Sequence, residues 1–135
     1  LIALRLSNTS IDILKQLNYS NIEQIDLSIN RLEPSILEKI PFTTARLLYL
    51  YDLNLNISLD FLNGMQNTRL THLDMSKNRI NFNTFNNLMS SSSLFYLNLA
   101  HTNMTDVVFD KILILDDFKK LGVLNISFNS IEWIR

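Results

Sequence analysis

The side chains that most often carry out chemistry are sparse in this sequence and are not spaced for catalysis. The two histidines, His72 and His101, have no cysteine to join them in a zinc site and no partner at H-x-x-x-H spacing. Asp116 and Asp117 form the one adjacent acidic pair, and we expect both on the solvated face of a helix rather than in a catalytic dyad. No serine lies in the G-x-S-x-G pattern of a nucleophile elbow. We therefore expect no catalytic residue, no metal site, no cofactor and no enzymatic activity.

The chemistry that remains is non-covalent recognition, because aromatic and polar residues recur at nearly constant spacing in the middle of the chain. His72 and Tyr96 are 24 residues apart, and Tyr49, Asp74 and Asn98 follow one another at steps of 25 and 24. Tyrosine is enriched at binding hot spots because it buries a large area and keeps a polar tip. Constant spacing needs a repeated structural unit that places these side chains together.

Such a unit runs through the whole chain, with the spacing L-x-x-L-x-L-x-x-N-x-L. Six copies begin near residues 1, 22, 45, 70, 94 and 121, at intervals of 21 to 27 residues. The ninth position holds Thr9 and Thr102 in the first and fifth copies and Leu53 in the third. This spacing and length are the signature of leucine-rich repeats. We expect one leucine-rich repeat domain over residues 1–135, and a piece of a longer array because neither end carries a capping segment.

The physics of the motif predicts the fold. Apolar residues at the fourth and sixth positions alternate with outward-facing ones, which is the pattern of a short strand with one buried face. The ninth residue lies where the chain turns inward, and the amides of Asn30, Asn78 and Asn129 can bond backbone groups that would otherwise be buried unpaired. Leu53 cannot, so the third copy should have a distorted turn. Because single copies cannot bury their own apolar faces, we expect an α/β leucine-rich repeat solenoid: a curved horseshoe segment with a parallel concave β-sheet and a loop or helical convex side.

The convex segments show a helical pattern toward the C-terminus. Apolar residues recur every third position over residues 106–121, which predicts a helix with one apolar stripe and with Asp106 as its N-cap. Residues 83–89 are a shorter helix candidate. Pro34 and Pro41 leave room for a single helical turn at most.

The third, fifth and seventh positions of every copy face the same side of the sheet, so each forms a column across the stacked copies. In the third, fourth and fifth copies these columns bring aromatic and polar side chains together, with Phe95 and His101 at the rim. The predicted ligand-binding residues on this concave face are Tyr49, Tyr51, His72, Asp74, Tyr96 and Asn98. In the alternative interpretation, the tyrosines only cover the strands, as cross-strand aromatic pairs do.

The third copy has two possible frames. The frame that begins at Ala45 keeps the intervals between copies even and gives the patch just described, and we prefer it. A frame that begins at Leu50 would instead turn Asp52, Asn54 and Asn56 toward the concave face.

Composition and charge limit the possible partners and cellular location of the protein. The net charge is −1 and there is no basic run, so we expect no nucleic-acid partner. No stretch approaches the roughly 18 apolar residues of a membrane span. Five N-x-S/T sequons, more than composition alone predicts, indicate an extracellular or cell-surface glycoprotein. The glycosylation candidates are Asn8, Asn18, Asn56, Asn103 and Asn125.

The segments L-D-M-S-K-N-R-I at 73–80 and L-N-I-S-F-N-S-I at 124–131 resemble the ectodomain repeats of Toll-like receptors and related cell-surface leucine-rich repeat proteins. The resemblance implies a horseshoe that binds a protein partner or ligand through its concave or lateral face, in innate immunity or adhesion. The segment after Met104 is instead similar to the helical segments of ribonuclease-inhibitor-type repeats. The alternative is therefore a cytoplasmic scaffold that docks a protein partner, and dimerisation is open in both cases.

Overall fold

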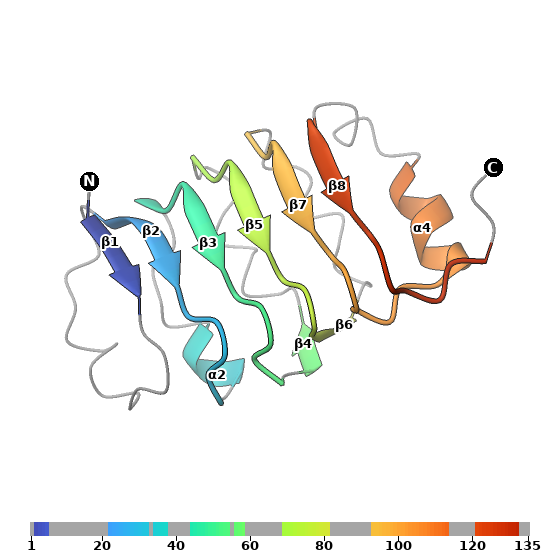
Figure 1. Cartoon of the computed structure of the whole chain (residues 1–135), viewed down its shortest axis with the longest axis horizontal. Coiled ribbons are helices and arrows are strands. Elements are labelled where there is room, and N and C mark those ends of the chain that lie inside the picture. Colours follow the sequence, from blue (N-terminus) through green and yellow to red (C-terminus); the bar gives the residue numbers. More distant parts are fainter. Residues whose placement is uncertain are drawn as a thin grey trace.

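The computed structural model describes residues 2–5, 22–32, 34–37, 44–54, 56–58, 69–81, 93–113 and 121–132, and it shows an α/β arrangement built on a parallel sheet (Figure 1). Six strands lie side by side in chain order, and every pair is parallel. The strands are β1 (Ile2–Arg5), β2 (Ile22–Asp26), β3 (Leu47–Tyr49), β5 (His72–Asp74), β7 (Tyr96–Asn98) and β8 (Val123–Asn125). Parallel neighbours cannot be joined by a tight hairpin, so the chain must cross back between each pair of strands.

The return segments carry the remaining elements. Strands β4 (Asn56–Ser58) and β6 (Arg79–Asn81) pair in a second, parallel two-stranded sheet. Helix α2 (Pro34–Leu37) is the single turn that the sequence predicts, and α4 (Asp106–Leu113) covers the first half of the helix predicted over residues 106–121. None of the helices described is long and apolar enough to cross a membrane.

The start of helix α4 differs from the prediction. The predicted N-cap at Asp106 is wrong by one residue, because the carbonyl oxygen of Thr105 accepts the N–H of Phe109 at 2.9 Å and so opens the helix. Asp106 instead lies in the first turn, where its charge is favourable to the helix dipole. The helix predicted at 83–89, like the pair Asp116–Asp117, lies outside the described residues.

The core lies beneath the main sheet. In the main sheet, each strand from β2 to β7 directs the residue at the fourth position of the motif inward, and the residue at the sixth position, just after the strand, is also buried. The side chains at these positions have an exposed fraction of zero: Ile25, Leu27, Leu48, Leu50, Leu73, Met75, Leu97 and Leu99. Since a continuous apolar layer is built only when neighbouring strands supply it, this packing makes each copy depend on the next.

The strand register follows the frame of the third copy that begins at Ala45. Leu48 pairs with Leu73 and Tyr49 pairs with Asp74. The alternative frame does not occur, because Asp52 and Asn54 follow β3 in a turn and Asn56 belongs to the second sheet.

The turns after the strands share a left-handed residue at the eighth position of the motif. Its φ angle lies between 55° and 58° at Ile29, Asp52, Lys77, His101 and Phe128. The predicted distortion of the third copy is present: Asn54, directly after Leu53, is a second left-handed residue with φ 53°.

The fifth copy, with Thr102 at the ninth position, has the same extra left-handed residue at Asn103, with φ 57°. The described copies with asparagine at the ninth position have none there. Asparagine tolerates this conformation better than most residues. The second left-handed turn therefore accompanies the loss of the motif asparagine.

The asparagines at the ninth position bond backbone groups as predicted, and Asn78 and Asn129 also reach into the preceding copy. The Asn78 Nδ2 atom donates to the carbonyl oxygens of Met75 at 3.0 Å and Leu50 at 2.7 Å, and its Oδ1 accepts the N–H of Leu53 at 3.0 Å. Asn129 donates to Leu99 in the same way, at 2.7 Å. The third copy lacks its own asparagine at the ninth position, and Asn78 of the fourth copy therefore bonds its backbone groups instead.

Candidate functional site

The fifth position of the motif has a structural role in most copies. Its side-chain oxygen accepts the backbone N–H two residues further on, which closes a small turn at the end of the strand. The acceptors are Asp26, Asp74, Asn98 and Asn125, with N···O distances of 3.1, 2.9, 3.1 and 3.1 Å respectively. The polar column on this face is therefore explained by the fold and is not in itself a sign of binding.

Tyr49 interrupts that column. A phenol cannot close the turn, and the N–H of Tyr51 is accepted instead by the Oγ atom of Ser28 in the preceding copy, at 3.3 Å. Tyr51 is the second departure, because the neighbouring copies place Ser28 and Ser76 at the same position. The third copy thus replaces two small or turn-closing residues by tyrosines, and a neighbouring copy supplies the hydrogen bond that is lost.

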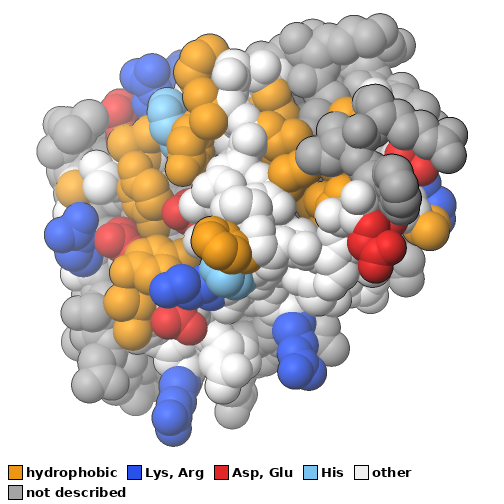
Figure 2. All heavy atoms as spheres, turned by 45° about the vertical axis from the view of Figure 1, so that its right-hand side comes forward, with side chains coloured by type: hydrophobic (Ala, Val, Ile, Leu, Met, Phe, Trp, Pro, Cys, Tyr) orange, Lys and Arg blue, Asp and Glu red, His pale blue; other side chains and the backbone are white. Residues whose placement is uncertain are grey.

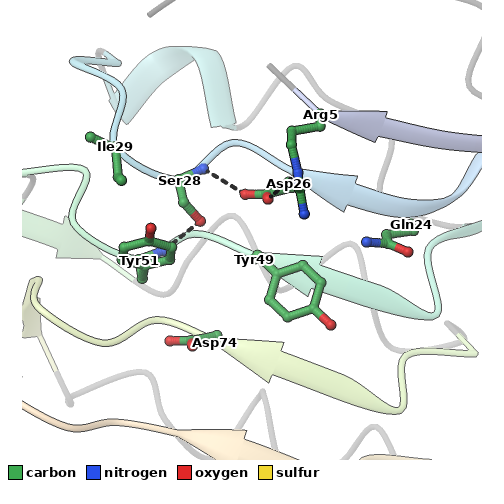
Figure 3. A pocket seen from close by; sticks show the side chains of 8 residues that line it. All are labelled: Arg5, Gln24, Asp26, Ser28, Ile29, Tyr49, Tyr51 and Asp74. Atoms are coloured by element: carbon green, nitrogen blue, oxygen red, sulfur yellow. Dashed lines mark hydrogen bonds and ion pairs between the residues drawn. The ribbon is translucent and has the colours of Figure 1, made fainter. Parts of the chain in front are cut away.

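These two tyrosines line an open cavity of about 440 Å³ on the exposed face of the sheet (Figure 3). Tyr49 lies between Asp26 on β2 and Asp74 on β5, with which it shares the register. The lining residues come from the first four copies: Arg5, Gln24, Asp26, Ser28, Ile29, Tyr49, Tyr51 and Asp74. We call this hollow the tyrosine cavity.

The sequence prediction missed the half of this cavity that the first two copies provide. Arg5, Asp26, Gln24 and Ser28 lie in the third-, fifth- and seventh-position columns, so register could have identified them; selecting for aromatic residues left them out. Ile29 lies in the turn and is 57 % exposed, and no column predicts its contribution.

The predicted patch divides into two neighbouring groups. Tyr49, Tyr51 and Asp74 form the first group, which lines the tyrosine cavity. Asn98 joins them, since its Nδ2 atom donates to Asp74 Oδ2 at 3.0 Å. His72 and Tyr96 form the second, with stacked rings whose centroids are 5.6 Å apart, and Phe95 lies 6.4 Å from His72. All six predicted residues are half-buried, so each retains surface for a ligand.

His72 borders a smaller cavity of about 210 Å³, lined by Glu23, Gln24, Arg46, Leu47, Thr71 and His72. The hydroxyl of Thr71 donates to the carbonyl oxygen of Arg46 at 3.1 Å, and its oxygen is 2.9 Å from His72 Nδ1. Because a hydroxyl has one proton to give, the tautomer of His72 decides which of the two atoms donates in this contact. Gln24 lines both cavities.

His101 does not join the predicted patch. Its ring stacks on Phe128 of the last copy, with centroids 4.4 Å apart and planes inclined by 7°. Figure 2 shows the two histidines at separate places on the surface, each against a hydrophobic side chain. Phe128 is 76 % exposed, so this pair is a separate apolar feature.

The two carboxylates beside Tyr49 differ in their electrostatic environment. Asp26 Oδ2 is 3.1 Å from the Nε atom of Arg5, an ion pair across neighbouring strands. Asp74 accepts hydrogen bonds from the backbone and hydroxyl of Ser76 and from Asn98, all neutral groups. Within the described part of the chain, Asp74 has no cationic partner.

Three of the five sequons lie within the described residues. Asn56 lies in β4, and Asn125 lies in β8 with its oxygen bonded to the hydroxyl of Ser127 at 2.8 Å. Asn103 is exposed, and its Oδ1 accepts the N–H of Ile80 at 3.1 Å. Asn8 and Asn18 lie outside the described residues.

Among the described residues, no three histidine, cysteine, aspartate or glutamate side chains gather as metal ligands would. The chain matches no protein-family model and no curated protein. A function for the exposed sheet face must therefore be inferred from its own side chains.

Proposed function

We propose that this chain is a leucine-rich repeat solenoid whose exposed, concave sheet face binds a protein partner or ligand around Tyr49 and Tyr51. The parallel strands in chain order, the left-handed eighth residue and the asparagines that bridge copies support the repeat architecture. The resemblance to Toll-like receptor ectodomains supports recognition at a cell surface, in an innate-immune or adhesion setting.

One observation carries the binding proposal: the third copy departs from its own repeat at both tyrosines. The fold favours aspartate or asparagine where Tyr49 lies and serine where Tyr51 lies. Both tyrosines instead line the tyrosine cavity together with charged groups. Half-exposed aromatic side chains that give up a turn-closing hydrogen bond are better explained by recognition than by stability.

Site-specific photo-cross-linking tests the location of the site. Benzoylphenylalanine replaces Tyr49 in one variant and Val107, which is 64 % exposed on α4, in the control. Cross-linking to the same partner from position 49 and not from position 107 is expected. Cross-linking from position 107 alone would move the site to the opposite surface.

The alternative, a cytoplasmic scaffold, is favoured by one feature, the helix α4 on the return segment. Glycan mass separates the two settings. Natively produced protein should lose mass on treatment with peptide N-glycosidase, and Asn103→Gln should remove one glycan because the Asn103 side chain is exposed. Protein with no glycan at any of the five sequons would favour the scaffold.

A further inference from the structure

We infer that the tyrosine cavity receives a positively charged side chain, an arginine or lysine of a peptide or protein partner, held against Asp74 and the ring of Tyr49. The inference rests on the proposed function and adds the chemistry of the ligand.

The structure already contains one such contact. Arg5 extends across the sheet face and places its Nε atom 3.1 Å from Asp26 Oδ2, although the Arg5 side chain is 76 % exposed and that of Asp26 only 17 %. Asp26 and Asp74 occupy the same register position, on either side of Tyr49. A fifth-position carboxylate on this face can therefore hold a guanidinium, and Asp74 is the equivalent carboxylate without one.

The burial and hydrogen bonds of the Asp74 carboxylate favour binding of a cation. The carboxylate is half-buried, and the contacts with Ser76 and Asn98 fix its orientation without compensating its charge. Oδ1 accepts two hydrogen bonds and Oδ2 one, and a carboxylate oxygen can accept about two, so Oδ2 keeps capacity for a further donor. A partly desolvated charge gains most from a charged donor.

The walls of the cavity fit the rest of such a side chain. Tyr49 lies on the strand next to Asp74, about 4.8 Å away, within the range of roughly 6 Å at which a cation interacts with an aromatic face. Tyr51 and the exposed Ile29 line the same cavity and supply further apolar surface. Arginine and lysine pack their alkyl stems on such surface while the charged head is held elsewhere.

A neutral saccharide is the rival ligand, since tyrosine and carboxylates also bind sugars. The hydrogen-bonding groups that a sugar would need are partly occupied, because Arg5 and Asp26 are bonded to each other. The charge of Asp74 would also remain uncompensated. The cation is therefore the better match.

The test is a nuclear magnetic resonance titration of the whole chain with a capped Gly-Arg-Gly peptide. The matched control is the same peptide with citrulline, which keeps the shape of arginine and lacks its charge. The amides of Tyr49, Tyr51 and Ser76 should shift, and arginine should bind about five- to tenfold more tightly than citrulline.

Three variants make the test specific. Asp74→Asn should remove the preference for arginine, and the fold should survive because Asn98 and Asn125 close the same turn in their copies. Asp110→Asn, exposed on α4, makes the same change in net charge and should leave the preference intact. Arg5→Gln frees Asp26 and should tighten arginine binding about twofold or more, as removal of a competing cation requires.

Equal binding of the two peptides, or an arginine preference that persists in Asp74→Asn, would overturn the inference. Shifts of the same amides by cellobiose, without a response to arginine, would assign the cavity to a saccharide. If position 49 still cross-links to a partner while arginine and citrulline bind alike, the proposed function stands and the cation assignment fails.

Discussion

The side-chain oxygen of Asn78 accepts the backbone N–H of Leu53 at 3.0 Å, across the boundary between two copies of the repeat. Leu53 occupies the position where its own copy lacks an asparagine, and Asn78 is 97 % buried, with an exposed fraction of 3 %. The same Asn78 also bonds Leu50, Met75 and Ser76. One side chain therefore satisfies buried backbone groups in two copies.

Replacing Asn78 by alanine should lower the free energy of unfolding by about 1–3 kcal/mol, because buried backbone donors and acceptors lose their partners. Urea denaturation gives this value. Lys111→Ala, exposed on α4, is the control and should change stability by less than about 0.5 kcal/mol. An Asn78→Ala protein as stable as the parent would show that the bridge between copies does not stabilise the fold.

Leu97→Ala should cost about 2–5 kcal/mol, since it deletes a side chain with an exposed fraction of zero and leaves a cavity. Val107→Ala removes a side chain that is 64 % exposed and should be close to neutral. The two variants are compared by chemical denaturation. Similar losses in both would contradict the assignment of the strand's central residue to the core.

The left-handed backbone at the eighth position predicts a gain in stability for one substitution and a loss for another. Ile29 is β-branched and exposed at φ 58°, so Ile29→Asn should raise stability by about 0.5–2 kcal/mol. Lys77→Ile, at φ 56° in the fourth copy, should lower it by a similar amount. Thermal melts of the two variants test the pair, and shifts of the same sign would refute the common backbone requirement.

Much of this arrangement follows from the sequence because the repeat is periodic. The alternation around Leu48 and Leu73 determines which side chains are buried, and the constant spacing of Tyr49 and Asp74 determines which residues pair. Periodicity says nothing about the interactions between side chains within a column. The bond of Arg5 to Asp26, and with it the extent of the cavity, depends on rotamers that neighbouring strands select.

The start of α4 and the turn at Asn103 were not predicted, because both depend on hydrogen bonds between residues close in sequence. Thr105 rather than Asp106 opens α4, and helix ends are commonly displaced by a residue or two. The left-handed Asn103 was not predicted from Thr102, the residue that replaces the motif asparagine in the fifth copy. The hydroxyl of Thr102 does bond Leu99 at 2.7 Å, but it has only one proton to donate, whereas an amide has two.

The central prediction is that Tyr49 serves binding rather than folding. In their own copies Asn98 and Asn125 close the turn that Tyr49 leaves open in the third copy. Tyr49→Asn should therefore let the side chain at position 49 accept the N–H of Tyr51, which Ser28 Oγ accepts in the parent protein. The variant should therefore melt at or above the temperature of the parent protein.

The decisive measurement pairs that melt with the affinity of Tyr49→Asn for the partner captured through position 49. We predict unchanged or raised stability together with a loss of about 1–3 kcal/mol in binding free energy, as for a hot-spot tyrosine. Full affinity accompanied by lost stability would contradict the account, because Tyr49 would then be a structural residue of the sheet.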